Sequence, residues 1–339
     1  MSPSDCIHIV EPGGRGGVYQ HVLGSVQKEK YGEFSRVVIH TARDAEITPD
    51  LPRAEYCSCM RWQRSGPRTW RTLLTLAWSL AYLLPHLILA SRRSRIEVQG
   101  QFGGGLFALI ILGAKATRTP VTFAPHNSFA RDGSRLSHGA LNMAIETADT
   151  LRLYNSRDFP FIPANRIVRD ELSMYIPECS VSDTLFWEEK IRKKDRLVIG
   201  FVGQLRKDKN PALLAAAVRM SGVAATLVYA GEDKGAVEDL SNVELGSNQD
   251  MVVIEEYLSL PKLVALVRLV DVIVCPYSVS SQSGVAALAR ELDKPVIASD
   301  VGGLGEQAEM VFEISSEPEQ ELAKAIATFA VRSGERRNA

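Results

Sequence analysis

The sequence is poor in features that mark several large classes of protein. Its formal net charge is only −1, so the overall charge gives no indication of nucleic-acid binding, and we expect none. It has only five cysteines, odd in number and scattered, and no signal peptide precedes them. We therefore expect a protein of the reduced cytoplasm rather than a disulfide-stabilised secreted domain.

Motifs for several kinds of chemistry are also missing. The sequence has no P-loop, no Gly-x-Ser-x-Gly elbow and no Asp-x-Asp pair at the end of an expected strand. No cluster of His, Cys and Asp suggests a metal, and Cys57-x-Cys59 has neither metal-site spacing nor a histidine nearby in the sequence. We expect free thiols there, no metal site and no cofactor.

The first glycine-rich loop does not make a dinucleotide fingerprint. In Gly13-Gly14-Arg15-Gly16-Gly17, the position of the third motif glycine is taken by Tyr19. The acid required at the end of the second strand is also missing, since that strand ends at His40. This disfavours an ordinary dehydrogenase, and the loop is either a tight strand-to-helix turn or a phosphate-compatible one.

The length of 339 residues suits two domains of about 150 residues each. Short apolar strands alternate with helical stretches in both halves, which predicts parallel, doubly wound α/β sheets. The pattern breaks between residues 175 and 195, so we predict domains over 1–180 and 190–339. The expected strands are 6–10, 36–40, 95–99, 120–124, 150–154, 196–203, 226–231, 271–276 and 295–299.

The most informative segment runs from Cys275 to Glu306. It reads as a strand ending at Pro276-Tyr277, a serine-rich turn, a helix beginning near Ser283-Gly284, a strand, and a loop with Gly302-Gly303. Such a unit presents backbone N–H groups at a helix N-terminus on the carboxyl edge of the sheet, where a phosphate or sugar hydroxyl can bind. The candidate binding residues here are Ser281, Gln282, Ser283, Gly284, Val285 and Glu306.

A second candidate loop, from Gly203 to Pro211, lies between an expected strand and an expected helix. It contains Arg206 and Lys209, which could stabilise a diphosphate leaving group. At the end of the strand 120–124, His126-Asn127 could hydrogen-bond a sugar or an acceptor.

These segments resemble glycosyltransferase family 4. The family order of Pro-Tyr/Ser, small-residue turn, helix and "(K)PVIASDVGG..E" recurs in 275–306, and "G(R/Q)(L/I)R..KN" recurs from Gly203 to Asn210. His126-Asn127 is similar to the family's "(P/T)HN" strand end. The resemblance implies the GT-B architecture, with two Rossmann-like domains facing a cleft: an acceptor-side N-terminal domain and a C-terminal domain that binds the nucleotide sugar.

The resemblance also assigns roles to the candidate residues. Arg206 and Lys209 hold the donor phosphates, residues 281–285 with Gly203 receive sugar and phosphates, and Glu306 contacts ribose or sugar. His126, Asn127 and the Gly16-Gly17 turn line the sugar and acceptor side.

The sequence departs from the family's Glu-x7-Glu pair. Ser280 and Leu288 stand at the two positions, so this chain resembles a subset that relies on backbone N–H groups instead. Gln204 also stands where many members carry Arg.

One stretch of the first half has an unusual composition. Between Arg53 and Arg95 there are eight arginines against one acid, Glu55, and Thr72–Ser91 has no charged residue. As a helix, this stretch would extend about 30 Å. Three alternatives stay open: a helix packed on the first domain's sheet, a helix lying in an anionic membrane interface, and a transmembrane span.

The resulting prediction is a hexosyltransferase of polysaccharide biosynthesis that uses a UDP- or GDP-linked sugar. The resemblance implies a glycan or lipid-linked acceptor, retention of anomeric configuration and no metal. The cysteines indicate the cytoplasm, and the interfacial alternative for 72–91 would make the protein peripheral on the inner face of the membrane. The alternatives are a nucleotide-sugar epimerase on the same fold and a catalytically silent partner in glycan assembly.

Overall fold

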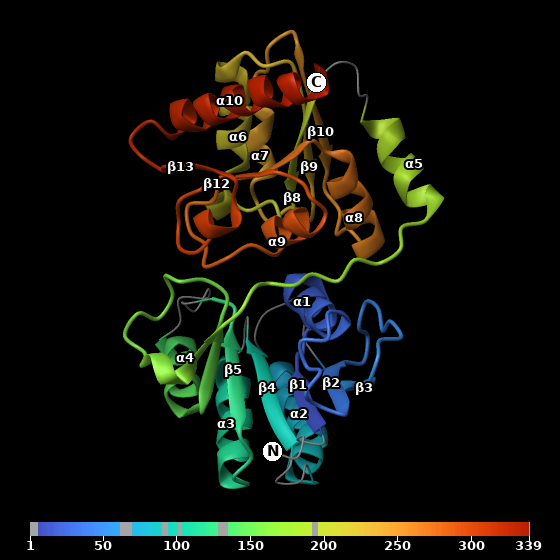
Figure 1. Ribbon diagram of the computed structural model, residues 1–339, viewed down its shortest axis with the longest axis vertical. Coiled ribbons are helices and arrows are strands. Elements are labelled where there is room, and N and C mark those ends of the chain that lie inside the picture. The colour runs from blue at the N-terminus through green and yellow to red at the C-terminus, as the bar shows by residue number, and fades with distance from the viewer. Residues whose placement is uncertain are drawn as a thin grey trace. The chain divides into compact units, whose positions relative to one another are not determined.

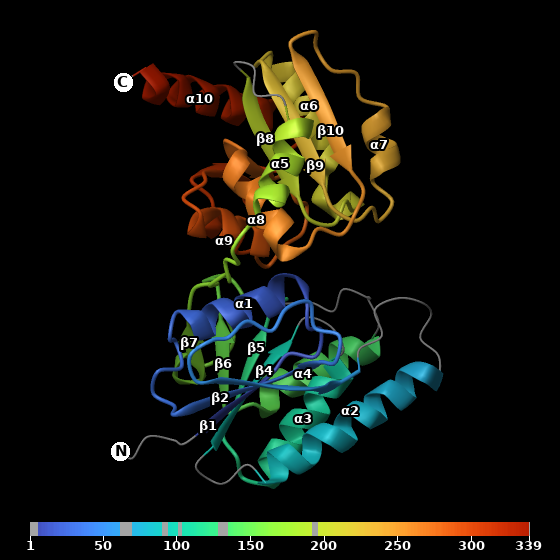
Figure 2. The same cartoon turned by 90° about the vertical axis from the view of Figure 1, so that its right-hand side faces the viewer.

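The computed structural model describes residues 6–61, 70–89, 94–100, 104–127, 135–191 and 196–338, which form two compact units (Figure 1, Figure 2). Unit 1 is Met1–Tyr175 and unit 2 is Ile176–Ala339. The predicted limits left 181–189 between the domains, whereas these residues belong to helix α5 (Val181–Lys190) of unit 2. Trp187 anchors this helix, because its side chain is fully buried and its Nε1 donates to the carbonyl of Lys262 at 2.8 Å.

Unit 1 contains a seven-stranded parallel sheet in the order β3-β2-β1-β4-β5-β6-β7. Its strands are β1 (Cys6–Val10), β2 (Arg36–Ala42), β3 (Ala54–Met60), β4 (Ser94–Gly100), β5 (Val121–Pro125), β6 (Thr150–Leu153) and β7 (Ile167–Arg169). Its helices are α1 (Gly16–Gln27), α2 (Trp70–Leu89), α3 (Gly104–Ala116), α4 (Arg135–Thr147) and the short η1 (Ala164–Arg166).

Two buried clusters hold this sheet to its helices. Ile7 and Ile9 of β1 pack with α1, whereas Val10 joins the cluster formed by α3 and the strands β4 to β6. Since successive side chains of a strand point to opposite faces, the two clusters lie on opposite sides of the sheet. Helices therefore cover both faces, as a doubly wound sheet requires.

Unit 2 contains a six-stranded parallel sheet in the order β10-β9-β8-β11-β12-β13. Its strands are β8 (Leu197–Val202), β9 (Ala225–Ala230), β10 (Gln249–Ile254), β11 (Val272–Cys275), β12 (Val296–Ser299) and β13 (Met310–Phe312). Besides α5, its helices are α6 (Pro211–Ser221), α7 (Val237–Ser241), α8 (Leu260–Leu269), α9 (Gly284–Glu291), α10 (Pro318–Asn338) and the short η2 (Lys207–Lys209) and η3 (Gly305–Gln307).

The predicted fold class is confirmed. Both sheets run in the doubly wound order in which the first and fourth strands of the unit are neighbours. The strands β3, β7, β10 and β13 were not predicted, and each lies at the edge of its sheet.

The charge-free stretch forms α2, and it packs on unit 1. Leu83 is fully buried in the cluster with α3, and Ser79 bonds both the N–H and the carbonyl of Arg61 at 3.1 and 3.2 Å. Among the described residues, no helix is apolar over a length sufficient to cross a bilayer. The packed-helix alternative is therefore confirmed for one face of α2, while Ser91, Arg92 and Arg93 lie outside the described residues.

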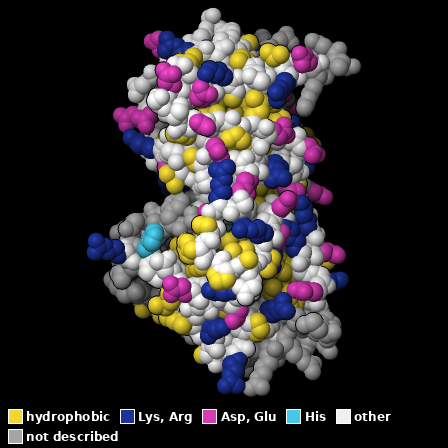
Figure 3. All heavy atoms as spheres, turned by 60° about the vertical axis from the view of Figure 1, so that its left-hand side comes forward, with side chains coloured by type: hydrophobic (Ala, Val, Ile, Leu, Met, Phe, Trp, Pro, Cys, Tyr) yellow, Lys and Arg dark blue, Asp and Glu magenta, His cyan; other side chains and the backbone are white. Residues whose placement is uncertain are grey.

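The opposite face of α2 is exposed and apolar. Leu74, Trp78 and Tyr82, spaced four residues apart, keep 59%, 40% and 45% of their surface exposed. Hydrophobic side chains also gather elsewhere on the face of unit 1 that Figure 3 presents. Phe161, with 77% exposure, is one exposed hydrophobic residue of unit 1 outside α2.

Candidate functional site

In unit 2, two loops flank the point where the strand order reverses. One follows β8 and contains 203–210, and the other follows β11 and contains 276–283. Because β8 and β11 are adjacent parallel strands, both loops leave the same carboxyl edge of the sheet. The two segments that the sequence singled out thus lie side by side.

Lys209 places its ammonium group between these loops. A Cβ built on Gly203, whose φ is +102°, would lie 3.3 Å from Lys209 Nζ and 3.6 Å from the side chain of Val285. The same Nζ lies 4.8 Å from the centre of the buried Tyr277 ring, a cation–π contact. The cation is therefore positioned beside the first turn of α9.

Arg206 is oriented differently, by an acid of its own loop. Its Nε and Nη2 donate to the two carboxylate oxygens of Asp208 at 2.9 and 2.5 Å. The carbonyl of Asp208 in turn accepts from the N–H and the hydroxyl of Ser278 at 2.9 and 3.0 Å. This couples the loop after β8 to the loop after β11.

The N-terminus of α9 is held by Ser283 and Gln307. Ser283 Oγ accepts from the N–H of Ala286 at 3.3 Å, as expected of an N-cap. The side chain of Gln307 accepts from Ser283 N–H at 2.7 Å and donates to Ser283 C=O at 3.1 Å. Within the described part of the chain, the first-turn N–H groups of Gly284 and Val285 have no hydrogen-bond partner and can meet a ligand.

The loop after β12 supports the same turn. Gly302 has φ +50°, and a Cβ there would lie 1.9 Å from the carbonyl of Ser280. Gly303 N–H donates to Ser281 C=O at 3.0 Å. Glu306 is exposed in η3, whereas Leu288 is fully buried, so the second position of the family's acid pair faces the core here.

In unit 1, the glycine-rich loop is occupied by a side chain of the chain itself. The buried Glu11 accepts from Gly13 N–H at 3.1 Å and from Gly14 N–H at 2.7 Å. These amides therefore bind a carboxylate already. Gly16, with φ +75°, and the exposed Gly17 begin α1 outside this contact.

His126 belongs to a buried polar network and is not an exposed group. It is 6% exposed, its Nε2 lies 2.6 Å from Gln99 Oε1, and its ring stacks on Tyr154 at 5.0 Å. Gln99 Nε2 donates to Glu97 at 2.6 Å, so the Gln99 oxygen is left to accept from His126. Asn127, beside it, is also buried.

A second histidine extends this network from α1. His21 Nε2 lies 2.9 Å from the hydroxyl of Tyr154. Burial lowers the pKa of His21 to about 3. Burial, and then the nearby His21, lowers the pKa of His126 well below its ordinary value. Both imidazoles are therefore neutral near pH 7. His126 can form hydrogen bonds there, but it does not carry a positive charge.

Comparison with protein families assigns the second unit. Residues 196–330 match the family model described as "Glycosyl transferases group 1". This part of the chain is similar to group 1 glycosyltransferases. The predicted enzyme class is confirmed at this level, and the resemblance to family 4 is supported, while the subset lacking the acid pair stays a prediction. No curated protein matches the sequence significantly.

Solved structures similar to the whole chain confirm the GT-B fold. HepE of Anabaena, in complex with UDP and glucose, aligns with a TM-score of 0.65 and 16% identity over 97% of this chain and 90% of that one. Sucrose-phosphate synthase of Thermosynechococcus elongatus aligns with 0.67 and 15% identity over 96% and 90%. The catalytic domain of starch synthase IV from Arabidopsis thaliana, bound to ADP and acarbose, aligns with 0.68 and 10% identity over 97% and 92%.

Unit 2 brings its sequence-predicted residues together in the loops after β8 and β11, the first turn of α9, and η3. Sequence reasoning missed the residues that hold them: Tyr277 under Lys209, Asp208 on Arg206, and Gln307 on Ser283. In unit 1 it missed Glu11 and Gln99. An acid directly after a strand and before a glycine run was the available signal for Glu11, whereas Gln307 carries no signal in the sequence.

Proposed function

We propose that this protein transfers a hexose from a UDP- or GDP-linked sugar to a glycan or lipid-linked glycan, with retention of anomeric configuration. The donor part rests on one observation: Lys209, Arg206 and the N-terminus of α9 converge within the part of the chain that is similar to group 1 glycosyltransferases. The bound UDP and glucose of the similar HepE structure support a UDP-linked donor.

Lys209 is the main cation for the departing diphosphate in this proposal. Lys209 contacts the face of Tyr277 beside the first turn of α9, whereas Arg206 is directed toward Asp208 of its own loop. The N–H groups of Gly284 and Val285, at the positive end of α9, add donors for the phosphate oxygens. Such preorganised charge stabilises a leaving group more in the transition state than in the bound donor.

The remaining predicted residues take the sugar and acceptor roles. Ser281, Gln282 and Glu306 contact the donor sugar or ribose. In unit 1, His126, Asn127 and the Gly16-Gly17 turn serve the sugar or acceptor side. His126 does so as a neutral imidazole, whose orientation Gln99 fixes.

The test is thermal stabilisation by UDP, GDP and ADP, followed by transfer assays with the matching donor sugars. A ligand at about 100 times its dissociation constant adds about 2.7 kcal/mol. We expect a melting shift with one nucleotide, lost in Arg206→Ala/Lys209→Ala and kept in the control Lys207→Ala, whose side chain is 73% exposed.

Other outcomes would identify the rival functions. No shift with any nucleotide would indicate a silent partner, and release of altered free sugar without acceptor would indicate an epimerase. The anomeric configuration of the product, read by NMR, tests retention.

We also propose that α2 lies on an anionic membrane surface. Its exposed stripe ends in the amphipathic rings of Trp78 and Tyr82, and the Arg61 guanidinium lies 4.6 Å from the Trp78 ring centre. Aromatic rings and arginines favour the headgroup region of anionic bilayers.

Flotation with anionic and with neutral liposomes tests this surface. We expect flotation with anionic lipid, reduced by Trp78→Ser/Tyr82→Ser and by Arg92→Ala/Arg93→Ala/Arg95→Ala, and unchanged by Phe161→Ser. Equal flotation of all variants, or flotation of none, would remove the proposal.

A further inference from the structure

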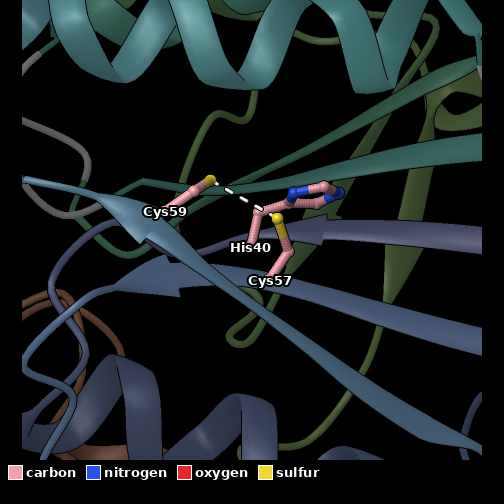
Figure 4. A group of neighbouring side chains, drawn as sticks. All are labelled: His40, Cys57 and Cys59. Carbon is pink, nitrogen blue, oxygen red and sulfur yellow. Dashed lines mark hydrogen bonds between the residues drawn. The ribbon is translucent and has the colours of Figure 1, made fainter.

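A histidine and two cysteines converge on neighbouring strands of unit 1 (Figure 4). His40 lies in β2, and Cys57 and Cys59 lie in the edge strand β3. One ring nitrogen and the two sulfur atoms all lie within 4.8 Å of one another. The sequence showed no histidine near Cys57 and Cys59, and the structure corrects this. Parallel pairing of β2 with β3 places His40, 17 positions before Cys57, next to both cysteines.

The pairing of the two strands explains the convergence. His40 is the register partner of Cys57, but the next partners are Ala42 and Met60, so β3 carries one extra residue at this point. Such a bulge is rare between parallel strands and changes the direction of a side chain. The interval includes Ser58 and Cys59, and the sulfur of Cys59 is 3.4 Å from that of Cys57.

The orientation of His40 is fixed from the opposite side. Its Nε2 lies 2.9 Å from Nδ1 of His8 on β1, and the two rings stack with centres 5.2 Å apart. Metal-binding histidines are typically held in this way through the nitrogen that does not bind the metal. Nδ1 of His40 is therefore the nitrogen assigned to the cluster.

Solvent access differs between the histidine and the two cysteines. His40 is fully buried, whereas Cys57 and Cys59 are half-buried on an edge strand. An ion can thus arrive from the thiol side and meet an imidazole that is already positioned.

We propose that Nδ1 of His40 and the sulfurs of Cys57 and Cys59 bind one Zn²⁺ ion. On binding, each thiol releases its proton to solvent as its sulfur bonds to the ion, and no electron is exchanged. Two thiolates and an imidazole are a ligand set that Zn²⁺ accepts, with a water in the fourth position. The ion clamps the edge strand β3 onto β2, independently of the donor site in unit 2.

The geometry lies close to that of a tetrahedral site. With zinc–sulfur bonds of about 2.3 Å, two ligand sulfurs lie about 3.8 Å apart. The sulfurs here are at 3.4 Å, and the largest separation in the cluster is below 4.8 Å. Adjustments of about 1 Å or less, within reach of χ1 rotations of half-buried thiols, complete the site.

The experiment uses the full chain, reduced and stripped of metal, titrated first with Zn²⁺ against a chromogenic chelator and then with Co²⁺. Cobalt bound by thiolates gives a sulfur-to-metal charge-transfer band, which reports the ligand type directly. The variants are Cys57→Ser, Cys59→Ser and the double variant, with Cys179→Ser in unit 2 as the matched control. Far-UV circular dichroism and the nucleotide-induced melting shift confirm that each variant is folded.

We expect one Zn²⁺ per chain, bound tightly enough to compete with the chelator, and a cobalt–thiolate band. Zinc uptake and the cobalt band should both be lost in the Cys57/Cys59 double variant and kept in Cys179→Ser. Zn²⁺ should raise the melting temperature of the wild type and of Cys179→Ser, but not that of the double variant. Absence of metal uptake by the reduced wild type overturns the proposal. So does uptake that survives the double substitution.

A Cys57–Cys59 disulfide is the competing chemistry, and it requires an oxidant. It would appear as a linked peptide lighter by two hydrogens in protein purified without reductant. That result, together with failure of the reduced chain to bind metal, would assign the pair to redox chemistry and overturn the zinc site.

Discussion

The two units share a strand order but differ in the side chains that lie at the carboxyl ends of their central strands. In unit 2, neighbouring side chains fix the position of the candidate binding groups. Tyr277 packs against Lys209, and Gln307 hydrogen-bonds Ser283 at the start of α9. In unit 1 the loop amides are already bound by Glu11, and His126 is enclosed with Gln99 and Tyr154. The same topology thus places Lys209 beside a helix N-terminus in unit 2 and encloses His126 in a hydrogen-bonded network in unit 1.

The largest effect should come from the cation of unit 2. Lys209→Ala removes a preorganised positive charge and should lower kcat about 10²- to 10³-fold, or roughly 3–4 kcal/mol. Arg206→Ala should cost less, because Asp208 compensates that guanidinium, and Lys207→Ala should cost almost nothing. The three variants are ranked by their rates of nucleoside diphosphate release. The assay uses the donor sugar whose nucleotide stabilises the protein. A larger effect of Arg206→Ala would reverse the assignment of the main cation.

The next effect concerns the support of the turn. Gln307→Leu leaves the buried N–H of Ser283 without its partner, whereas Ser283 C=O still accepts from Ala287 N–H at 3.0 Å. The loss of this one partner should destabilise unit 2 by about 1–3 kcal/mol. The neighbouring Glu306→Gln should leave the melting temperature unchanged and raise KM for the donor. Loss of stability in Glu306→Gln, with normal KM, would remove the proposed sugar or ribose contact.

Much of this comparison was accessible from the sequence, but not all of it. The buried central strands and the glycines at their ends predicted both sheets, because continuous apolar runs report burial on both faces. The edge strand β3, with Glu55, Ser58 and two cysteines, carries no such run. Lys209 and Ser283 followed from a motif. Gln307 and His40 did not, because their roles arise from contacts between segments distant in the sequence.

Acid should affect unit 1 through its buried histidines. Burial holds the pKa of His21 at about 3, against an ordinary value of 6.5. The unfolded chain therefore binds a proton that the folded one does not, so stability is complete above about pH 6.5 and falls as the pH decreases toward 3. The loss is about 1.4 kcal/mol for each pH unit within that window.

Hydrogen exchange of unit 1 peptides at pH 7.5, 6 and 5 measures this dependence. His21→Gln should make the dependence shallower, with the part that burial of His126 causes remaining, and the exposed His138→Gln should leave it unchanged. Equal slopes for wild type and His21→Gln would show that His21 is not responsible.

The smallest effect should come from the filled loop of unit 1. Glu11→Gln keeps one acceptor oxygen but directs an amide toward Gly13 or Gly14, and should lower the stability of unit 1 by about 1 kcal/mol. The nucleotide-induced melting shift should persist, because the donor site is proposed to lie in unit 2. Loss of that shift in a folded Glu11→Gln variant would break the comparison, since a loop closed by its own carboxylate would then contribute to binding the donor.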